Sequence, residues 1–421
     1  YQFMSEKYLA AVDMGTNSFH LVVVRADDAG HFEIVGREKE SVRLGSGAGD
    51  LETITPEAME RGIAVLARYG KIASSMNAPL RAVATSAVRE AHNKDDFLRK
   101  VKEKTGLEPE VIPGHEEARL IYMGMLQALP VFDRKILMID IGGGSTEFLI
   151  GRGAEVAFAV SLKLGAIRLK DRFFSREPLT KSQVEECRKF LQIQLTGMRD
   201  EAKKHSFEMA VGSSGTIETL AELISPVPQE SGETRHRDLA ITKKDLDQIV
   251  EKILSYETAR KRQSIPGLDE KRADIIVGGA VLLQEIFAAL SIEKMTVSPY
   301  ALREGVIYDT LLREERRADL GNIRRSSVLH LLNSFSRKGY TGSESSKHSA
   351  FLALRFFHEL KRLKLITDLG ESDAFLLESA VLLHNIGLII SHSGHHKHSY
   401  YIIKNSELLM GFTSQEIEII S

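Results

Sequence analysis

The feature that most constrains this chain is a glycine-rich turn between two apolar segments in residues 136–150, ILMIDIGGGSTEFLI. The pattern predicts a buried strand, a turn with almost no side chains and a returning strand. Consecutive glycines let backbone N–H groups approach an oxyanion closely and point into one concavity. Asp140 and Glu147 bracket the turn and could hold a divalent cation or a water beside a phosphate. A structural hairpin whose acids satisfy turn amides explains the same residues, so this segment alone leaves both interpretations open.

A second copy of the pattern lies near the start of the chain. Residues 10–23 read AAVDMGTNSFHLVV, and the spacing Asp-x-Gly-x-x-Ser occurs at Asp13 and again at Asp140, 127 residues later. Apolar segments flank both copies. Two similar strand-turn-strand units indicate a duplicated domain with a ligand held between the halves.

Composition limits the classes of protein that remain. A chain of 421 residues exceeds what one core usually supports, so we expect two or three domains. The formal net charge of -2 does not attract polyanions to the whole molecule. We therefore expect no nucleic-acid partner, and local basic groups must hold any phosphate-rich substrate. Cys187 is the only cysteine, which excludes a disulfide scaffold or cysteine-ligated zinc within one chain and fits a reducing cytosol.

The arrangement of strand and helix patterns predicts α/β layers in the first three quarters of the chain. No membrane span is expected, because Gln284 and Glu285 interrupt the longest apolar stretch, 275–290, which predicts a buried helix. Residues 225–240 are polar and interrupted by proline, which is typical of an exposed loop. Thr55 and Thr242 are expected helix N-caps. The predicted strands are 9–24 as a hairpin, 32–44, 80–86, 136–150 as a hairpin, 154–160, 209–212 and 294–298; the predicted helices are 56–76, 95–104, 115–129, 180–204, 242–258, 272–290 and 301–314.

The character of the chain changes near residue 318. Beyond it only helical patterns occur, at 326–335, 344–364, 371–390 and 396–408, which predicts a separate all-α module. The pattern reaches Ser421 without a capping or tail signal, which leaves open that the natural chain continues. Apolar helix faces in this module, such as those of Phe351, Leu352 and Phe356, suggest a homodimer.

Four motifs, in this order along the chain, resemble the exopolyphosphatase/guanosine pentaphosphate phosphohydrolase (Ppx/GppA) family: AAVDMGTNSFHLVV, IDIGGGSTEFLI, VGSSGTIETLA and SPYALREGVIYDTL. That family belongs to the actin/sugar-kinase/Hsp70 superfamily. The resemblance implies an α/β fold of two ribonuclease H-like domains flanking a cleft, at residues 4–128 and 129–300. It implies that helix 301–314 packs back on the first domain and that residues 318–421 form an HD-like module.

The resemblance also implies hydrolysis of a terminal phosphate by water, with Mg²⁺. Such a reaction needs a base for the attacking water, donors for the equatorial oxygens and cations against the developing charge. In the E-E-x-R pattern the catalytic base is Glu117, while Glu116 is expected only to interact favourably with the dipole of its helix. Arg89 in ATSAVREAHN matches a phosphate-binding arginine, whose planar fork suits bidentate contact.

The resemblance also implies roles for three carboxylates and for residues in the loops. The implied metal or water ligands are Asp13, Asp140 and Glu147. Residues 212–216, GSSGT, match the third loop of the superfamily's site. This third loop either contacts substrate or simply joins a strand to a helix. Arg303 and Glu304 are expected to pair with each other in the hinge rather than to act in the chemistry. The expected phosphate-binding residues are Thr16, Asn17, Ser18, Arg89, Gly142, Gly143, Gly144, Ser145, Gly212, Ser213, Gly215 and Thr216.

The C-terminal module is rich in histidine but is not expected to hold a catalytic metal. True HD phosphohydrolases place Asp directly after His, whereas this chain has His384-Asn385. A basic segment at 361–364 and the pair Arg324-Arg325 could guide a polyanion, although charged helix faces are usually only solvated. The histidines expected to serve in polar packing or in contact with a phosphate chain are His348, His384, His392 and His398.

The expected function is release of terminal phosphate from polyphosphate in the cytoplasm. Hydrolysis of pppGpp is the alternative, because both substrates present the same terminal phosphoanhydride. A small-molecule kinase of the same superfamily and a non-catalytic sensor are the other candidates, since one fold supports several chemistries. The E-E-x-R pattern favours water over an organic acceptor, and the presence of every expected acid disfavours a silent sensor.

Overall fold

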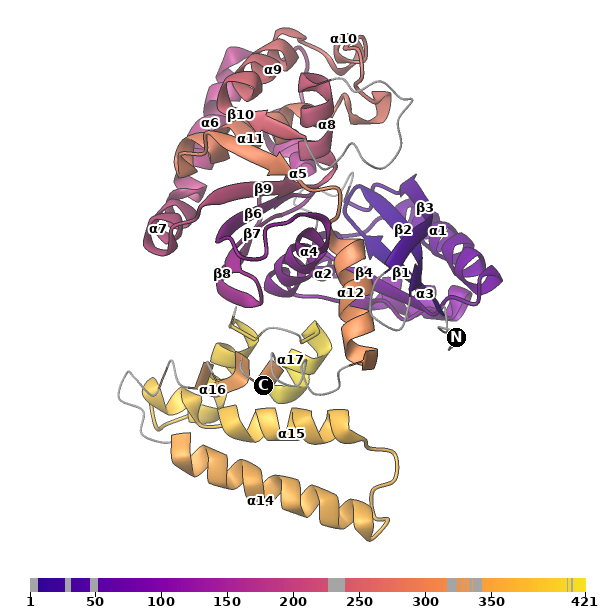
Figure 1. Cartoon of the computed structure of the whole chain (residues 1–421), viewed down its shortest axis with the longest axis vertical. Helices are drawn as coiled ribbons and strands as arrows, with labels where there is room; N and C mark the ends of the chain where they lie inside the picture. The colour runs from indigo at the N-terminus through magenta and orange to yellow at the C-terminus, as the bar shows by residue number, and fades with distance from the viewer. Residues whose placement is uncertain are drawn as a thin grey trace. The chain divides into compact units, whose positions relative to one another are not determined.

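The computed structural model describes residues 7–26, 32–45, 52–225, 239–315 and 324–421, the last without 326, 330, 333–334, 336–342, 407 and 410–411. The chain forms two compact units (Figure 1). The first comprises Tyr1–Glu110 and Glu117–Leu311, and the second comprises Val111–Glu116 and Leu312–Ser421.

The first sheet has five strands in the order β3-β2-β1-β4-β5. Strand β1 pairs antiparallel with β2, where Asp13 lies opposite His20, and parallel with β4. The predicted hairpin, the following strands and the helices at 56–76 and 95–104 are confirmed, and Thr55 caps its helix by accepting from the Ala58 amide. Helix α2 was not predicted. The elements are β1 (Lys7–Met14), β2 (Ser18–Ala26), β3 (Phe32–Ser41), β4 (Leu80–Ala84), β5 (Glu110–Val111), α1 (Pro56–Ser75), α2 (Ser86–Glu90) and α3 (Lys94–Thr105).

The second sheet repeats this arrangement with six strands in the order β10-β11-β9-β6-β7-β8. Strand β6 pairs antiparallel with β7, where Asp140 lies opposite Glu147, and parallel with β9. The same pairing of a hairpin with one parallel neighbour confirms the duplication that the two glycine-rich motifs predict. The strands are β6 (Ile136–Ile141), β7 (Thr146–Arg152), β8 (Glu155–Leu162), β9 (Met209–Ser213), β10 (Ala240–Thr242) and β11 (Lys294–Val297).

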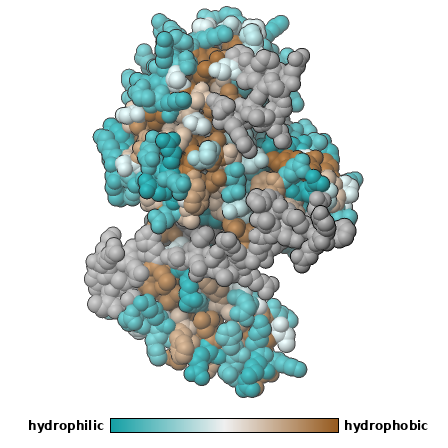
Figure 2. Space-filling view, in the orientation of Figure 1, coloured by the Kyte–Doolittle hydropathy of each residue, from teal (hydrophilic) through white to brown (hydrophobic). Residues whose placement is uncertain are grey.

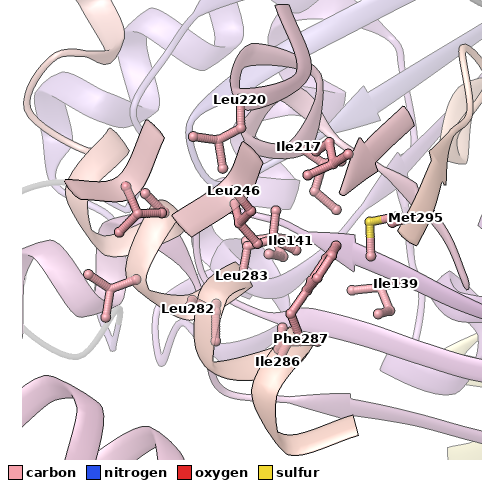
Figure 3. Close-up of a cluster of buried hydrophobic side chains, with 14 of the residues drawn as sticks. Ile139, Ile141, Ile217, Leu220, Leu246, Leu282, Leu283, Ile286, Phe287 and Met295 are labelled. Carbon is pink, nitrogen blue, oxygen red and sulfur yellow. The ribbon is translucent and has the colours of Figure 1, made fainter. Parts of the chain in front are cut away.

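Each sheet of the first unit and the helices packed on it form one lobe, and the helices of the second lobe bury its apolar core. Figure 3 shows Ile139 of β6, Leu220 of α8 and Phe287 of α11 among the side chains that meet there. Helix α11 is buried almost throughout, as its apolar composition predicts. The single helix predicted at 180–204 is wrong, because the chain forms two helices, α6 and α7, that meet at Leu195. The helices are α5 (Ala166–Phe173), α6 (Lys181–Gln194), α7 (Thr196–His205), α8 (Gly215–Ile224), α9 (Lys243–Ser255), α10 (Ala259–Arg262), the 3₁₀ turn η2 (Glu270–Arg272) and α11 (Ile276–Leu290).

Two helices, α4 (Gly114–Ala128) and α12 (Leu302–Glu315), cross at a close contact. A Cβ on Gly305 would lie 1.8 Å from the Leu120 carbonyl oxygen, so only glycine permits this approach. Asp309 of α12 accepts hydrogen bonds from Arg119 of α4 at 2.8 Å and from Arg81 of β4 at 2.7 Å. These contacts fix α12 against the first lobe.

Within residues 324–421 of the second unit, the described part of the chain contains helices and turns but no strand. Its core includes Leu331, Leu383, Leu409 and Phe412. The all-α prediction is confirmed, although α17 was not predicted, and part of the helix expected at 326–335 and nearly all of the loop expected at 225–240 lie outside the described residues. The helices are α14 (Ser343–Arg362), α15 (Glu371–Leu383), η3 (Ile386–Ile389), α16 (His395–Lys404) and α17 (Ser414–Ile420).

Among the described residues, one segment is long and apolar enough to cross a membrane. This segment is Glu371–Ile389, and 44% of its most apolar window is buried in the helical module. Core helices of soluble proteins pass the same test, so composition alone does not make this segment a span.

Candidate active site

A cavity of about 140 Å³ lies where the two glycine-rich turns meet. It is lined by residues of both sheets, by the start of α8 and by α4 and α12. Four predicted site residues, Arg89, Glu147, Gly212 and Ser213, are outside the lining. The predicted residues that line the cavity are Asp13, Thr16, Asn17, Ser18, Glu117, Asp140, Gly142, Gly143, Gly144, Ser145, Gly215 and Thr216.

The two turns have the same local construction. In the first, the Gly15 amide donates to the Ser18 carbonyl at 3.2 Å, and in the second the Gly142 amide donates to the Ser145 carbonyl at 2.9 Å. A Cβ on Gly143 would lie 3.1 Å from Cβ of Thr16, so the turns face each other closely. No described residue accepts from the Gly143 amide, which leaves that donor for an anion.

The third loop contributes only part of its length to the cavity. Ser214 has φ +96°, an uncommon conformation for a residue with a side chain, and it caps α8 by accepting from the Ile217 amide. The N-terminus of α8 therefore borders the cavity, and its partial positive charge favours anions. Ser213 instead donates to the buried carboxylate of Asp140, and Gly212 packs beneath Met295. The loop thus contacts the cavity with its second half and supports an acid with its first.

Glu117 and Arg89 form an ion pair of 2.9 Å beside the cavity. Glu117 is only 7% exposed, and burial raises the pKa of its carboxyl group above the usual value, while Arg89 opposes that rise. The carboxylate is therefore held in one position by a planar cation, with a raised affinity for a proton. Both properties suit a general base.

Three further acids lie close to Glu117, of which Asp140 and Glu147 are buried and Asp13 is partly exposed. Burial, and then the charge of Glu117, raises the pKa of Asp13 to about 8. Burial likewise raises the pKa of Asp140 to about 7, although the Ser213 hydroxyl opposes this. The pKa of Glu147 also lies well above its usual value because of burial and the neighbouring acids, and its Oε1 accepts from Ser145 and Ser161, each at 2.7 Å. An added cation would relieve the repulsion within this cluster.

The resemblance implies a Mg²⁺ site, and the number and type of donor atoms in this cluster show whether the cluster could form one. Among the described residues, no three His, Cys, Asp or Glu side chains are close enough together to chelate a metal by themselves. Mg²⁺, however, is usually bound through one or two carboxylates with waters and substrate phosphates, and it prefers oxygen ligands. The oxygen-only donors Asp13 and Asp140 in the cavity lining fit that mode of binding.

Several lining residues were not among the predicted binding residues. Arg303 lines the cavity and donates to Nδ1 of His20 at 2.7 Å. Because arginine cannot accept a hydrogen bond, this contact requires an unprotonated Nδ1, and burial with the nearby cations lowers the pKa of His20. The predicted pairing of Arg303 with Glu304 also occurs, at 2.9 Å. Arg303 lies in the motif SPYALREGVIYDTL, but the prediction gave it only a pairing role in the hinge and no role in binding.

Arg272 and Glu218 complete this end of the cavity. A Cβ on Gly215 would lie 2.0 Å from a terminal nitrogen of Arg272, so the absence of a side chain at Gly215 makes room for the guanidinium. Burial raises the pKa of Glu218, and the charges of Arg303 and Lys39 oppose that rise. No local pattern marks Arg272, because it lies on a short 3₁₀ turn far along the chain from both glycine-rich motifs.

Comparison with known proteins shows which family has this architecture. The model of the Ppx/GppA phosphatase family matches residues 22–314, and the model of its domain III matches residues 323–421. The chain belongs to the Ppx/GppA phosphatase family. An exopolyphosphatase structure from Cytophaga hutchinsonii is 32% identical with a TM-score of 0.68, over 72% of this chain and 98% of that one. A Ppx/GppA family member from Aquifex aeolicus is 26% identical with a TM-score of 0.64, over 74% of this chain and 100% of that one.

Family membership confirms two predictions. The first part of the chain has the two-lobed α/β fold of Ppx/GppA proteins, and the helical end corresponds to their domain III. The protein is a phosphatase, and the cavity between the glycine-rich turns is where the structure collects the acids, amides and arginine that such a reaction needs.

Proposed function

We propose that this protein releases orthophosphate from the end of inorganic polyphosphate, using a water molecule activated by Glu117. Hydrolysis of the 5′-terminal phosphate of pppGpp is the alternative, because the bond cleaved is the same. The observation that carries this proposal is the 2.9 Å pair of Glu117 and Arg89 beside a cavity built from two glycine-rich turns. The resemblance to a structure named an exopolyphosphatase supports polyphosphate as the substrate.

In the proposed reaction, the water oxygen attacks the terminal phosphorus and the bridging P–O bond breaks. Glu117 accepts the proton of the water, and the shortened chain leaves with the bridging oxygen. Amides of the turns, such as that of Gly143, would hold the equatorial oxygens, and Arg89 would stabilise their charge. Arg89 also keeps the Glu117 carboxylate oriented between turnovers.

We also propose that Mg²⁺ takes part and that Asp13 and Asp140 would hold it, while Glu147, opposite Asp140 in the β6–β7 pairing, accepts hydrogen bonds from Ser145 and Ser161. A bound ion would supply positive charge against the phosphate oxygens. The raised pKa values of these acids support this assignment, because a cation favours their ionised forms.

The charge of the cavity supports polyphosphate as the substrate. Arg272 and Arg303 line the same cavity, and they could hold the phosphates that follow the terminal one.

The test is phosphate release from both substrates with Mg²⁺, using wild type and Glu117→Gln. We expect kcat to fall on the order of 10²- to 10⁴-fold, because general base catalysis typically contributes that much. Glu116→Gln is the matched control, since it makes the same chemical change at the adjacent position. Near-wild-type turnover by Glu117→Gln would show that the base is misassigned, and no release from either substrate would exclude the proposed activity.

Two further proposals concern the cellular location and the oligomeric state of the enzyme. We propose a cytoplasmic homodimer that associates through α14, where Phe351 and Phe356 are 55% and 71% exposed. Figure 2 shows hydrophobic side chains at the surface of the helical module among hydrophilic ones. A single-chain mass in light scattering at micromolar concentration would contradict the dimer, and Phe356→Glu should dissociate it.

A further inference from the structure

The chain enters the catalytic helix from the second unit. Residues Val111–Glu116 cluster with the C-terminal helices, whereas the residues that follow, from Glu117 onward, cluster with the two lobes. Helix α4 begins at Gly114, so its first turn contains residues of both units. The proposed general base is therefore the first residue of this helix that belongs to the lobes.

His115 attaches this first turn to the helical module. Its side chain is buried, at 6% exposed, and its Nε2 lies 2.7 Å from the carbonyl oxygen of Leu409. A carbonyl oxygen only accepts, so Nε2 must carry the hydrogen of this bond. Leu409 is fully buried and packs in the same core as Leu383 and Phe412. The acceptor is thus backbone held firmly by the centre of the module.

The geometry of an α-helix allows the same turn to serve two neighbours. Residues two apart lie about 200° apart around the axis, because a helix has 3.6 residues per turn. His115 can therefore bind the Leu409 carbonyl while Glu117, from the opposite side of the turn, pairs with Arg89 and lines the cavity. Any rotation of the first turn that breaks the His115 bond also moves the carboxylate of Glu117.

We propose that His115 is a positioning residue through which the C-terminal module controls the orientation of Glu117. This inference rests on the proposed role of Glu117 as general base. The module then acts on the chemical step as well as on any substrate that it contacts. Loss of the His115 bond displaces Glu117 and leaves the two turns and the arginines that line the cavity in place, so it lowers kcat more than it changes KM.

The experiment compares His115→Leu with His115→Gln in the full chain. Leucine fills the space but cannot donate, whereas the glutamine amide reaches the position of Nε2 and restores the donor. We expect kcat for polyphosphate to fall about 10- to 100-fold in His115→Leu, because a misplacement near 1 Å can cost that much. His115→Gln should recover most of the rate. His396→Leu makes the same change at an exposed position of the module and should leave the rate unchanged.

Three measurements separate positioning from a merely structural role. A positioning role predicts a split between kcat and KM, and a shift in the acidic limb of the pH profile, because Glu117 would lose its alignment with Arg89. Amide hydrogen exchange in residues 114–121 should become faster in His115→Leu and return to the wild-type rate in His115→Gln.

These outcomes decide the inference whether or not the proposed activity holds. Unchanged kcat in His115→Leu, or equal losses in the leucine and glutamine variants, would overturn the positioning role. If wild type releases phosphate from neither substrate, the proposed function fails, and hydrogen exchange alone decides the coupling. In that case, unchanged exchange in residues 114–121 of His115→Leu overturns the coupling, and faster exchange with recovery in His115→Gln supports it.

Discussion

Replacing Asp140 by asparagine should make the metal-free protein more stable and at the same time inactive. The Asp140 carboxyl group is buried, at 8% exposed, and accepts a hydrogen bond from Ser213. Asparagine has nearly the same shape, and its carbonyl oxygen can accept the same bond. The substitution therefore removes a buried charge while it keeps the packing and the hydrogen bond.

The magnitude follows from the pKa of this group. Burial raises the pKa from 3.8 to about 7. A difference of about three units corresponds to about 4 kcal/mol, at 1.36 kcal/mol per unit. Because the folded-state pKa is the higher one, the folded protein is favoured below pH 3.8, and that stability is lost as the pH rises through about 7. The asparagine side chain does not titrate, so the stability advantage of the Asp140→Asn variant should grow between pH 4 and pH 7 and reach up to about 4 kcal/mol.

The assay is urea unfolding in EDTA at several pH values between 4 and 8. The chain contains no tryptophan, so circular dichroism is the suitable signal. Asp200→Asn, at a side chain that is 67% exposed, is the matched control and should show no such pH-dependent gain. Added Mg²⁺ should stabilise wild type and narrow its difference from Asp140→Asn. The reasoning is refuted if Asp140→Asn is no more stable than wild type at pH 8, or if its advantage does not change with pH.

Three other predictions follow from the same cavity. Gly143→Val should reduce phosphate release at least 100-fold while costing about 1–3 kcal/mol of stability, since its side chain would crowd Thr16 at about 3 Å; turnover near wild type would contradict the close approach of the two turns. Arg272→Gln should raise KM for polyphosphate about 10-fold or more with a smaller change in kcat, as expected for loss of a charge-assisted hydrogen bond; steady-state kinetics measure this, and an unchanged KM would remove Arg272 from substrate binding. Chelation with EDTA should abolish phosphate release and Mg²⁺ should restore it, so full activity in EDTA would exclude the proposed metal.

Local patterns accounted for most elements because each depends on neighbours in the chain. Alternating apolar residues and two glycine-rich turns located the hairpins, and Thr55 and Thr242 marked helix starts through hydroxyl groups that accept from the first turn. The errors occurred where local signals are weak. The helix predicted at 180–204 kept its periodicity across Leu195, where α6 ends and α7 begins.

The repeated spacing Asp-x-Gly-x-x-Ser marked the two turns as related units from sequence, although the second turn by itself fitted a structural hairpin equally well. The close approach of the two turns could not be predicted from sequence, because it depends on how two sheets pack: Gly143 lies against Thr16, 127 residues away in the other repeat. Arg272 reaches the cavity only because Gly215 lacks a side chain, and no spacing in the chain encodes that pair.

Glu117, the proposed general base, also has some properties that the sequence determines and others that only the tertiary structure determines. Its position at the start of a helix, after Pro113-Gly114, is a local property that the chain specifies by itself. Its ion pair with Arg89 and the bond from His115 to Leu409, 294 residues further along the chain, are long-range contacts. Such contacts arise only when separate segments collapse on shared cores, so only the tertiary structure could show which neighbours hold Glu117 in place.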